Sequence, residues 1–166
     1  MIGYLKLFEK STEHELTANK TEQEAKRCVI LGVRVPTVID FADILKLKAV
    51  KHLQGNKDMK EVFDFMSLFT STEAKEFEGK VKTYTKLMSE EKLALEDVIK
   101  KKQYVQICSL KLDKSSNFKY DELAAVLNIK KDDVEAWAIE AIAGGIIDAK
   151  IDQVEEVIVI KSHIMN

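Results

Sequence analysis

A change in hydrophobic pattern near residue 114 limits the fold of this chain more than any other property of its sequence. Before that point, apolar residues recur at intervals of three and four, the spacing of the buried face of a helix. The clearest such face comprises Met59, Val62, Phe63, Met66 and Phe69. With one proline and six glycines in 166 residues, long helices are rarely interrupted. Residues 1–113 are therefore predicted to form a stack of antiparallel helices.

After residue 114, two helical faces are followed by two strand-like runs. The first helix is expected to end at Asn128, because asparagine tolerates the left-handed conformation. Asp132 is expected to cap the second helix and Gly144 to end it. Alternating and β-branched residues then predict strands at 147–151 and 157–160.

Helix, turn, helix and a two-stranded wing is the order of a winged helix. The sequence thus predicts a mainly α protein, in which stacked antiparallel helical repeats (1–113) precede a C-terminal winged-helix module (114–163) with a small antiparallel β-sheet. A very short strand at Phe118 and Lys119 is expected before its first helix. The last residues, 164–166, are interpreted as a truncated tail, and the chain as part of a longer protein.

Several element boundaries within the stack are predicted from local signals. A short amphipathic segment is expected at 4–8, and Thr21 begins a stretch with the spacing of a capping box. Pro36 should end the helix that follows. Two short helices are predicted within 41–53, and one long helix over about 89–112.

No pattern in the sequence points to catalysis. The histidines (His14, His52 and His163) lack metal-ligand spacing and are interpreted as surface residues. The chain has no phosphate-binding glycine loop and no nucleophile elbow. The acidic pairs at 132–133 and 155–156 are expected at a helix start and in a turn, where solvent-exposed carboxylates are common. We therefore expect a protein that is not an enzyme and that has no cofactor and no metal.

The charge distribution argues against nucleic-acid binding by the winged helix. Residues 115–166 contain five lysines and ten acidic residues, a formal charge of −5. A recognition helix that presents Asp133, Glu135 and Glu140 would repel phosphate. The best basic run, Lys100-Lys101-Lys102, is interpreted as a solvated helix face. A nucleic-acid-binding winged helix is retained as the less favoured alternative.

The cysteines and the hydropathy profile favour a cytosolic or nuclear protein, and the cytoplasm is the location that we expect. Two cysteines, Cys28 and Cys108, cannot make a disulfide framework and are expected to be core residues. No stretch approaches the roughly 20 apolar residues that span a bilayer, and the N-terminus lacks the pattern of a secretory signal. Neither membrane insertion nor a membrane partner is expected.

What remains from the residues alone is protein binding. A winged helix exposes the edge of its sheet, where unpaired backbone groups can pair with a strand of another chain. A helical stack also offers extended surfaces to neighbours.

A helical stack fused to a winged helix resembles the PCI family, a module shared by the proteasome lid, the COP9 signalosome and eukaryotic translation initiation factor 3. Four stretches carry a closer resemblance to the M-type PCI subunits of the initiation factor: EAKRCVI at 24–30, LKLKAVKHLQG at 45–55, DDVEAW at 132–137 and KIDQ at 150–153. The C-terminal stretches also resemble subunit 7 of the COP9 signalosome. Ala49 departs from the pattern, since the family often has proline there.

The resemblance implies a non-catalytic scaffold subunit that docks other subunits through its PCI domain. The implied partners are PCI- and MPN-domain subunits of translation initiation factor 3 and, indirectly, the small ribosomal subunit. A COP9-signalosome scaffold is the alternative, and sequence-specific DNA binding is not expected. The predicted docking surface comprises the wing and the start of the second winged helix: Lys130, Lys131, Asp133, Ile146, Asp148, Lys150, Ile158 and Ile160. For Ile146, Ile158 and Ile160, filling the core of the module is an equally good interpretation.

Overall fold

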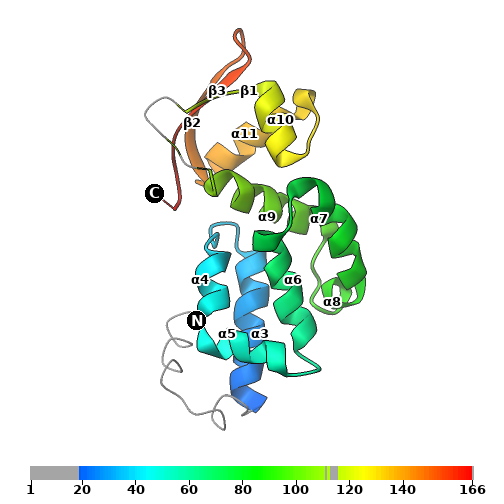
Figure 1. Cartoon of the computed structure of the whole chain (residues 1–166). Coiled ribbons are helices and arrows are strands. Elements are labelled where there is room, and N and C mark those ends of the chain that lie inside the picture. The colour runs from blue at the N-terminus through cyan, green and yellow to red at the C-terminus, as the bar shows by residue number, and fades with distance from the viewer. Residues whose placement is uncertain (1–18, 111, 113–115, 166) are drawn as a thin grey trace.

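The computed structural model describes residues 19–110, 112 and 116–165, and it consists of a helical stack followed by a small helix-and-sheet module (Figure 1). The amphipathic segment expected at 4–8 and His14 lie outside the described residues. So does most of the predicted boundary between the two parts, near residue 114.

The stack is built from one long helix and several short ones. The long helix, α3 (Asn19–Arg34), ends just before Pro36, as predicted. Thr21 lies within α3 and is buried, so the prediction that it caps the helix was wrong. The short helices are α4 (Phe41–Lys46), α5 (Lys48–His52), α6 (Lys60–Ser71), α7 (Ala74–Val81) and α8 (Thr85–Glu90).

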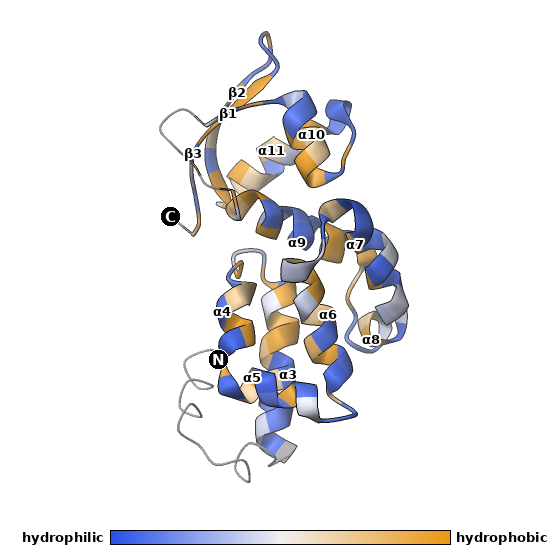
Figure 2. Cartoon of the chain, in the orientation of Figure 1, coloured by the Kyte–Doolittle hydropathy of each residue, from blue (hydrophilic) through white to orange (hydrophobic). Residues whose placement is uncertain are grey.

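A cluster of aromatic rings holds α4, α6 and α7 together. Phe69 of α6 lies at its centre, with its ring centroid 4.8 Å from that of Phe41 and 5.1 Å from that of Phe77. Phe65 completes the cluster at 5.7 Å from Phe69. All four rings are buried. The pairs of Phe69 with Phe41 and Phe65 are edge-to-face, and such pairs add about 0.5–1.5 kcal/mol each beyond their burial. Figure 2 shows that α3, α4 and α6 each carry hydrophobic and hydrophilic positions, as amphipathic helices do.

The long helix predicted over 89–112 is two helices, α8 and α9 (Leu95–Cys108), so this prediction was wrong. The break falls at Lys92, whose φ of 52° is left-handed. The Leu93 amide donates to Met88 O (2.8 Å) and the Lys92 amide to Ser89 O (3.2 Å), the bonds of a Schellman motif. Leu93 then packs on the core of the stack, and this burial compensates a left-handed residue that is not glycine.

The C-terminal module has the predicted winged-helix order. Its elements are β1 (Asn117–Lys119), α10 (Tyr120–Leu127), α11 (Val134–Ala143), β2 (Ile147–Asp152) and β3 (Val157–His163). The strands form an antiparallel sheet in the order β1-β3-β2. Asn128 follows α10 with φ 54°, in the left-handed region, as expected. Asp132 does not cap the second helix, because a 3-10 turn at Lys131–Asp133 comes first and α11 begins at Val134.

Helix α9 belongs to two hydrophobic cores. Val98, in its first half, packs in the core of the stack. Tyr104 and Ile107, in its second half, pack with Leu123, Trp137 and the strands of the winged helix. In Figure 1 the helix lies between the stack and the winged helix. Over the described residues, no helix combines the length and apolarity needed to cross a membrane.

Candidate protein-docking surface on the winged helix

Three consecutive buried side chains of α9 fix the winged helix to the stack. Lys101 Nζ donates to Val35 O (2.5 Å) and Pro36 O (3.2 Å), just beyond the C-terminal end of α3. Lys102 Nζ donates to Phe69 O (2.8 Å) near the end of α6. Lys101 is 2% and Lys102 4% exposed, so the interpretation of this lysine run as a solvated face was wrong for both. Lys100, half exposed and ion-paired with Glu140, alone fits it.

Gln103 continues this series toward the winged helix. Its Oε1 accepts a hydrogen bond from Trp137 Nε1 of α11 (3.0 Å), and its Nε2 donates to Leu127 O at the end of α10 (3.4 Å). Both side chains are buried. The two helices of the winged helix therefore have a fixed position relative to α9.

The β2 strand forms an edge of the sheet whose backbone is free on one side. Ile160 N donates to Ser116 O on the β1 side of β3, so Val157 and Val159 direct their backbone groups to β2. Their partners on β2 are Asp152 and Lys150.

It follows from this register that Ile147, Ala149 and Ile151 direct their N–H and C=O groups away from β3. None of these three edge amides donates a hydrogen bond to another residue in the described part of the chain. Ile147 is buried, whereas Ala149 and Ile151 are half-buried, so the β2 edge can pair with a strand of another protein along Ala149 and Ile151.

The outer face of the sheet carries alternating charges. Asp148, Lys150 and Asp152 are exposed along β2, and Lys161 of β3 lies 3.9 Å from Asp148, Nζ to Oδ1. Lys161 is the extra residue of a bulge, because Asp148 pairs with Ser162 and Ala149 with Ile160. Charged side chains and bulges are devices that limit indiscriminate pairing at a free edge. The edge can thus pair with a partner strand whose charges are complementary to those of β2.

A rigid turn projects an apolar side chain from the tip of the wing. Asp152 Oδ1 accepts from the amides of Val154 and Glu155, both at 3.1 Å. Glu156 has a φ of 52°. Val154 is 90% exposed, and it is apolar whereas its neighbours in the turn are polar. An exposed apolar residue held by such a turn is a candidate contact for a partner, which the charge pattern of the sequence did not bring out.

The start of the second winged helix is tied to the wing by ionic and polar contacts. Lys131 Nζ lies 2.5 Å from Glu156 Oε2 and 3.7 Å from Asp121 Oδ2. The hydrogen bond to Glu156 is the main reason that the pKa of Lys131 is raised. Gln153 Nε2 donates to Glu135 Oε1 at 2.5 Å. The wing and the 3-10 turn before α11 therefore form one continuous surface.

The structure divides the eight predicted docking residues into two groups. Ile146, Ile158 and Ile160 are at most 2% exposed and lie in the core of the winged helix, so these three are not part of the surface. The other five lie on the surface: Lys130, Asp133, Asp148 and Lys150 are exposed and Lys131 is half-buried. Because strand alternation does not say which face is outward, the sequence could not separate the two groups.

The other candidate groups in the sequence are its cysteines and histidines. Within the described residues, no group of three or more His, Cys, Asp and Glu side chains could hold a metal. Cys28 and Cys108 are buried as expected, and burial raises the pKa of Cys108 to about 11. His163, predicted on the surface, is buried, with its ring Nε2 3.3 Å from Leu110 O. His52 is half-buried and its Nε2 lies 3.6 Å from Glu22 Oε1.

Comparison with known protein families matches residues 76–162 to the PCI domain. This match covers more than half of the chain and includes α9 and nearly all of the winged helix. The chain therefore belongs to the PCI domain family.

Among curated proteins, the chain is similar to eukaryotic translation initiation factor 3 subunit M. It is 28% identical to that of Nematostella vectensis over 152 residues, which is 92% of this chain and 39% of the relative. Identity is 27% over 150 residues with that of Schistosoma japonicum (90% and 38%) and 26% over 156 residues with that of Homo sapiens (90% and 38%). The chain thus spans about two-fifths of the length of these relatives.

Proposed function

We propose that this chain is a non-catalytic docking subunit of a translation initiation factor 3 assembly, in which it binds neighbouring PCI- and MPN-domain subunits through its winged helix. The similarity to subunit M over nine-tenths of the chain supports the assembly. The observation that carries the docking role is the β2 edge, with outward backbone groups at the half-buried Ala149 and Ile151. We place this activity in the cytoplasm, with contact to the small ribosomal subunit only through the assembly.

The edge can be blocked without removing a side-chain contact. Replacing Ala149 by proline deletes an amide that points away from β3, so the ladder between β2 and β3 keeps its bonds. Ala149→Ser is the matched control, because it keeps the amide and the small side chain. Both variants are expected to fold, which their far-UV circular dichroism checks.

The test is affinity purification of the tagged chain from eukaryotic cells, with mass spectrometry of the recovered proteins. We expect the wild type and Ala149→Ser to recover PCI- and MPN-domain subunits of the initiation factor, and Ala149→Pro to lose at least one of them. Recovery of no such subunit by the wild type would contradict the assembly. Unchanged recovery by Ala149→Pro would contradict the role of the edge. Recovery of COP9 signalosome subunits instead would favour the alternative assembly.

Nucleic-acid binding by the winged helix is the second candidate, and the charges oppose it. The 3-10 turn and α11 present Asp132, Asp133 and Glu140 to solvent, where a phosphate-binding module needs lysine and arginine. Titration with duplex DNA and RNA at several salt concentrations is expected to give no saturable, salt-dependent binding.

A further inference from the structure

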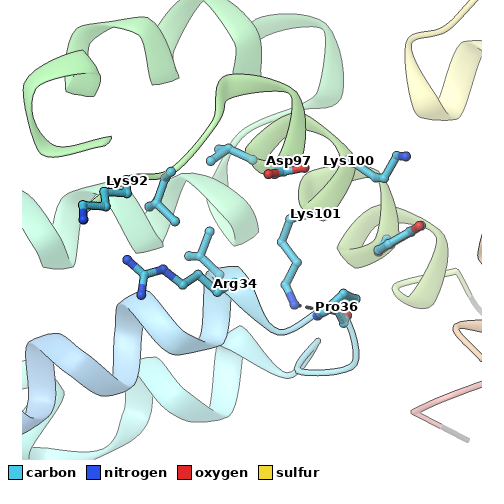
Figure 3. A pocket seen from close by; sticks show the side chains of 10 residues that line it. Arg34, Pro36, Lys92, Asp97, Lys100 and Lys101 are labelled. Carbon is cyan, nitrogen blue, oxygen red and sulfur yellow. Dashed lines mark hydrogen bonds between the residues drawn. The ribbon is translucent and has the colours of Figure 1, made fainter. Parts of the chain in front are cut away.

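A cavity of about 270 Å³ lies between the end of α3 and the first half of α9 (Figure 3). Its lining carries an excess of positive charge. It includes one acidic residue, Asp97, and four cationic residues, Arg34, Lys92, Lys100 and Lys101. In Figure 3, Arg34 comes from α3, Lys92 from the loop before α9, and Lys100 and Lys101 from α9 itself. Segments distant in the sequence thus bring cations together around one cavity.

Three of these cations have no acidic partner in the described part of the chain. Lys100 is ion-paired with Glu140. Arg34 donates to a neutral group, the carbonyl of Glu91, whose carboxylate is paired with Lys26. Lys92 lines the cavity, is exposed, and makes no ion pair with any described residue.

Lys101 is the most unusual of the three, because its charge is buried. The ammonium donates to two backbone carbonyls and lies 5.2 Å from the centroid of the Phe41 ring. Among the described residues no carboxylate forms an ion pair with Lys101, and burial lowers the pKa of Lys101 to about 8. A buried cation without a counter-ion is costly, so a negative group placed in the adjoining cavity would be favoured.

The rest of the lining is apolar. Val33, Leu93 and Val98 contribute hydrocarbon walls, and the Tyr104 ring closes one side. The volume is slightly below the range of about 300–1,000 Å³ typical of sites for small molecules and cofactors. One or two side chains of another protein fit this size and this mixture of charge and hydrocarbon.

We propose that this cavity is a second docking site, which takes a glutamate or aspartate side chain and an adjoining apolar side chain from a partner protein. The proposal rests on the proposed function, because it gives the docking subunit a contact on the helical part, separate from the β2 edge. Arg34 and Lys92 attract and orient the carboxylate at the mouth, and the field of Lys101 stabilises it from below. The hydrocarbon walls receive the apolar neighbour.

A partner protein is favoured over a nucleic acid by the surroundings of the cavity. Glu91 precedes Lys92 in the sequence and accepts from Arg34 through its carbonyl, and Glu140 is ion-paired with Lys100. A nucleic-acid strand needs a continuous basic track along its phosphates, whereas one carboxylate needs only this local cluster.

The test uses the isotope-labelled protein and three probes followed by NMR. The first is the capped dipeptide acetyl-leucyl-glutamate amide, the second its glutamine counterpart, and the third uridine monophosphate. We expect the glutamate probe to shift backbone amides within 33–35 and 92–101 and to bind at least about fivefold more tightly than the glutamine probe. Equal affinity of the two dipeptides, shifts elsewhere, or tighter binding of the nucleotide would overturn the proposal.

Charge-matched variants test whether the cations are responsible. Arg34→Gln combined with Lys92→Gln should weaken binding of the glutamate probe by about fivefold. Lys57→Gln combined with Lys60→Gln removes the same charge from two exposed residues that do not line the cavity, and it should leave the affinity unchanged. Equal loss in both double variants would show a general charge effect and would overturn the proposal.

The same variants separate this inference from the proposed function. In affinity purification, the Arg34→Gln/Lys92→Gln variant should lose a partner that Ala149→Pro retains. If the wild type recovers no subunits at all, the proposed function fails, and the dipeptide titration still decides whether the cavity binds a carboxylate.

Discussion

At the scale of single residues, the most informative feature is the series Lys101, Lys102 and Gln103. Each side chain bonds to the end of a different helix: α3, α6 and α10. The last carbonyls of a helix lack partners within it and carry partial negative charge. Two ammonium groups and an amide satisfy them here, so three neighbouring residues join elements from both parts of the molecule.

Replacing Gln103 by leucine should lower the free energy of unfolding by about 1–3 kcal/mol, because the buried Trp137 N–H then has no acceptor. Chemical denaturation measures the change. Gln106→Leu on the same helix should change stability by no more than about 0.5 kcal/mol. In a Trp137→Phe background, where no indole N–H needs a partner, Gln103→Leu should cost clearly less. An equal cost in both backgrounds would contradict this account.

Lys101 should make stability depend on pH in the alkaline range. Its pKa is lowered from 10.5 to about 8 in the folded state, so between these values the unfolded chain binds more protons. Stability contributed by this group therefore rises with pH across that window. The stability of the wild type relative to Lys101→Met should increase by about 1–3 kcal/mol.

Urea denaturation of both proteins at pH 7.5 and at higher pH, to about 10, measures this difference. Taking the difference cancels the opposing effect of Tyr104, whose raised pKa applies to both proteins. It cancels that of Cys108 only in part, because Lys101 itself lowers the pKa of this thiol. A difference that is flat or that falls with pH would contradict the lowered pKa.

The burial of the lysine run could not have been predicted from the sequence. Three consecutive lysines on a helix are ordinarily solvated, and nothing near them in the sequence names their partners. The acceptors Val35, Pro36 and Phe69 lie more than thirty residues away. Only tertiary packing brings these carbonyls to α9.

At the scale of elements, left-handed residues define where helices stop. Lys92 and Asn128 both follow helices with φ above 50°. The second was predicted, because asparagine adopts this conformation readily. The first was not, because lysine gives no such signal, and the predicted helix therefore ran through it.

Asn128→Ala should destabilise the protein by about 1–2 kcal/mol, since alanine disfavours the left-handed conformation. Asn128→Gly should be near neutral, because glycine adopts it without steric cost. Thermal unfolding of the two variants beside the wild type measures both effects. Equal destabilisation by alanine and glycine would mean that the asparagine side chain, and not the backbone, is what matters.

The winged helix was predictable as a set of elements, and its surface was not. Strong periodicity predicted α10, α11 and both wing strands, and Asn128 and Gly144 predicted the ends of the two helices. The start of α11 was misplaced, because a 3-10 turn competes with a capping aspartate over the same residues. Which isoleucines of the sheet face inward depends on which face the helices cover. The core that they enter includes Tyr104 and Ile107 of α9, which lie far from the strands in sequence.

At the scale of the whole molecule, the two cores share one helix. Val98 packs in the first and Ile107 in the second, less than three turns apart on α9. Loss of either core would expose half of this helix. The stack and the winged helix are therefore expected to unfold together.

This cooperativity can be observed directly, because the single tryptophan, Trp137, reports on the winged helix alone. Its fluorescence and the far-UV circular dichroism of all the helices should give coincident urea transitions. The same midpoint is expected from both probes in Gln103→Leu, shifted to lower urea. Separate transitions would show that the two cores are independent.

Because α9 runs through both cores, the free strand edge and the cationic cavity are carried on a single stiff body and not on two tethered ones. A partner that binds both sites loses its orientational freedom when it binds the first of them. Binding the second site then costs no further orientational freedom, because α9 fixes the distance between the two sites. The fold would thus determine the angle between neighbouring chains. No hinge or linker would have to become ordered when they bind.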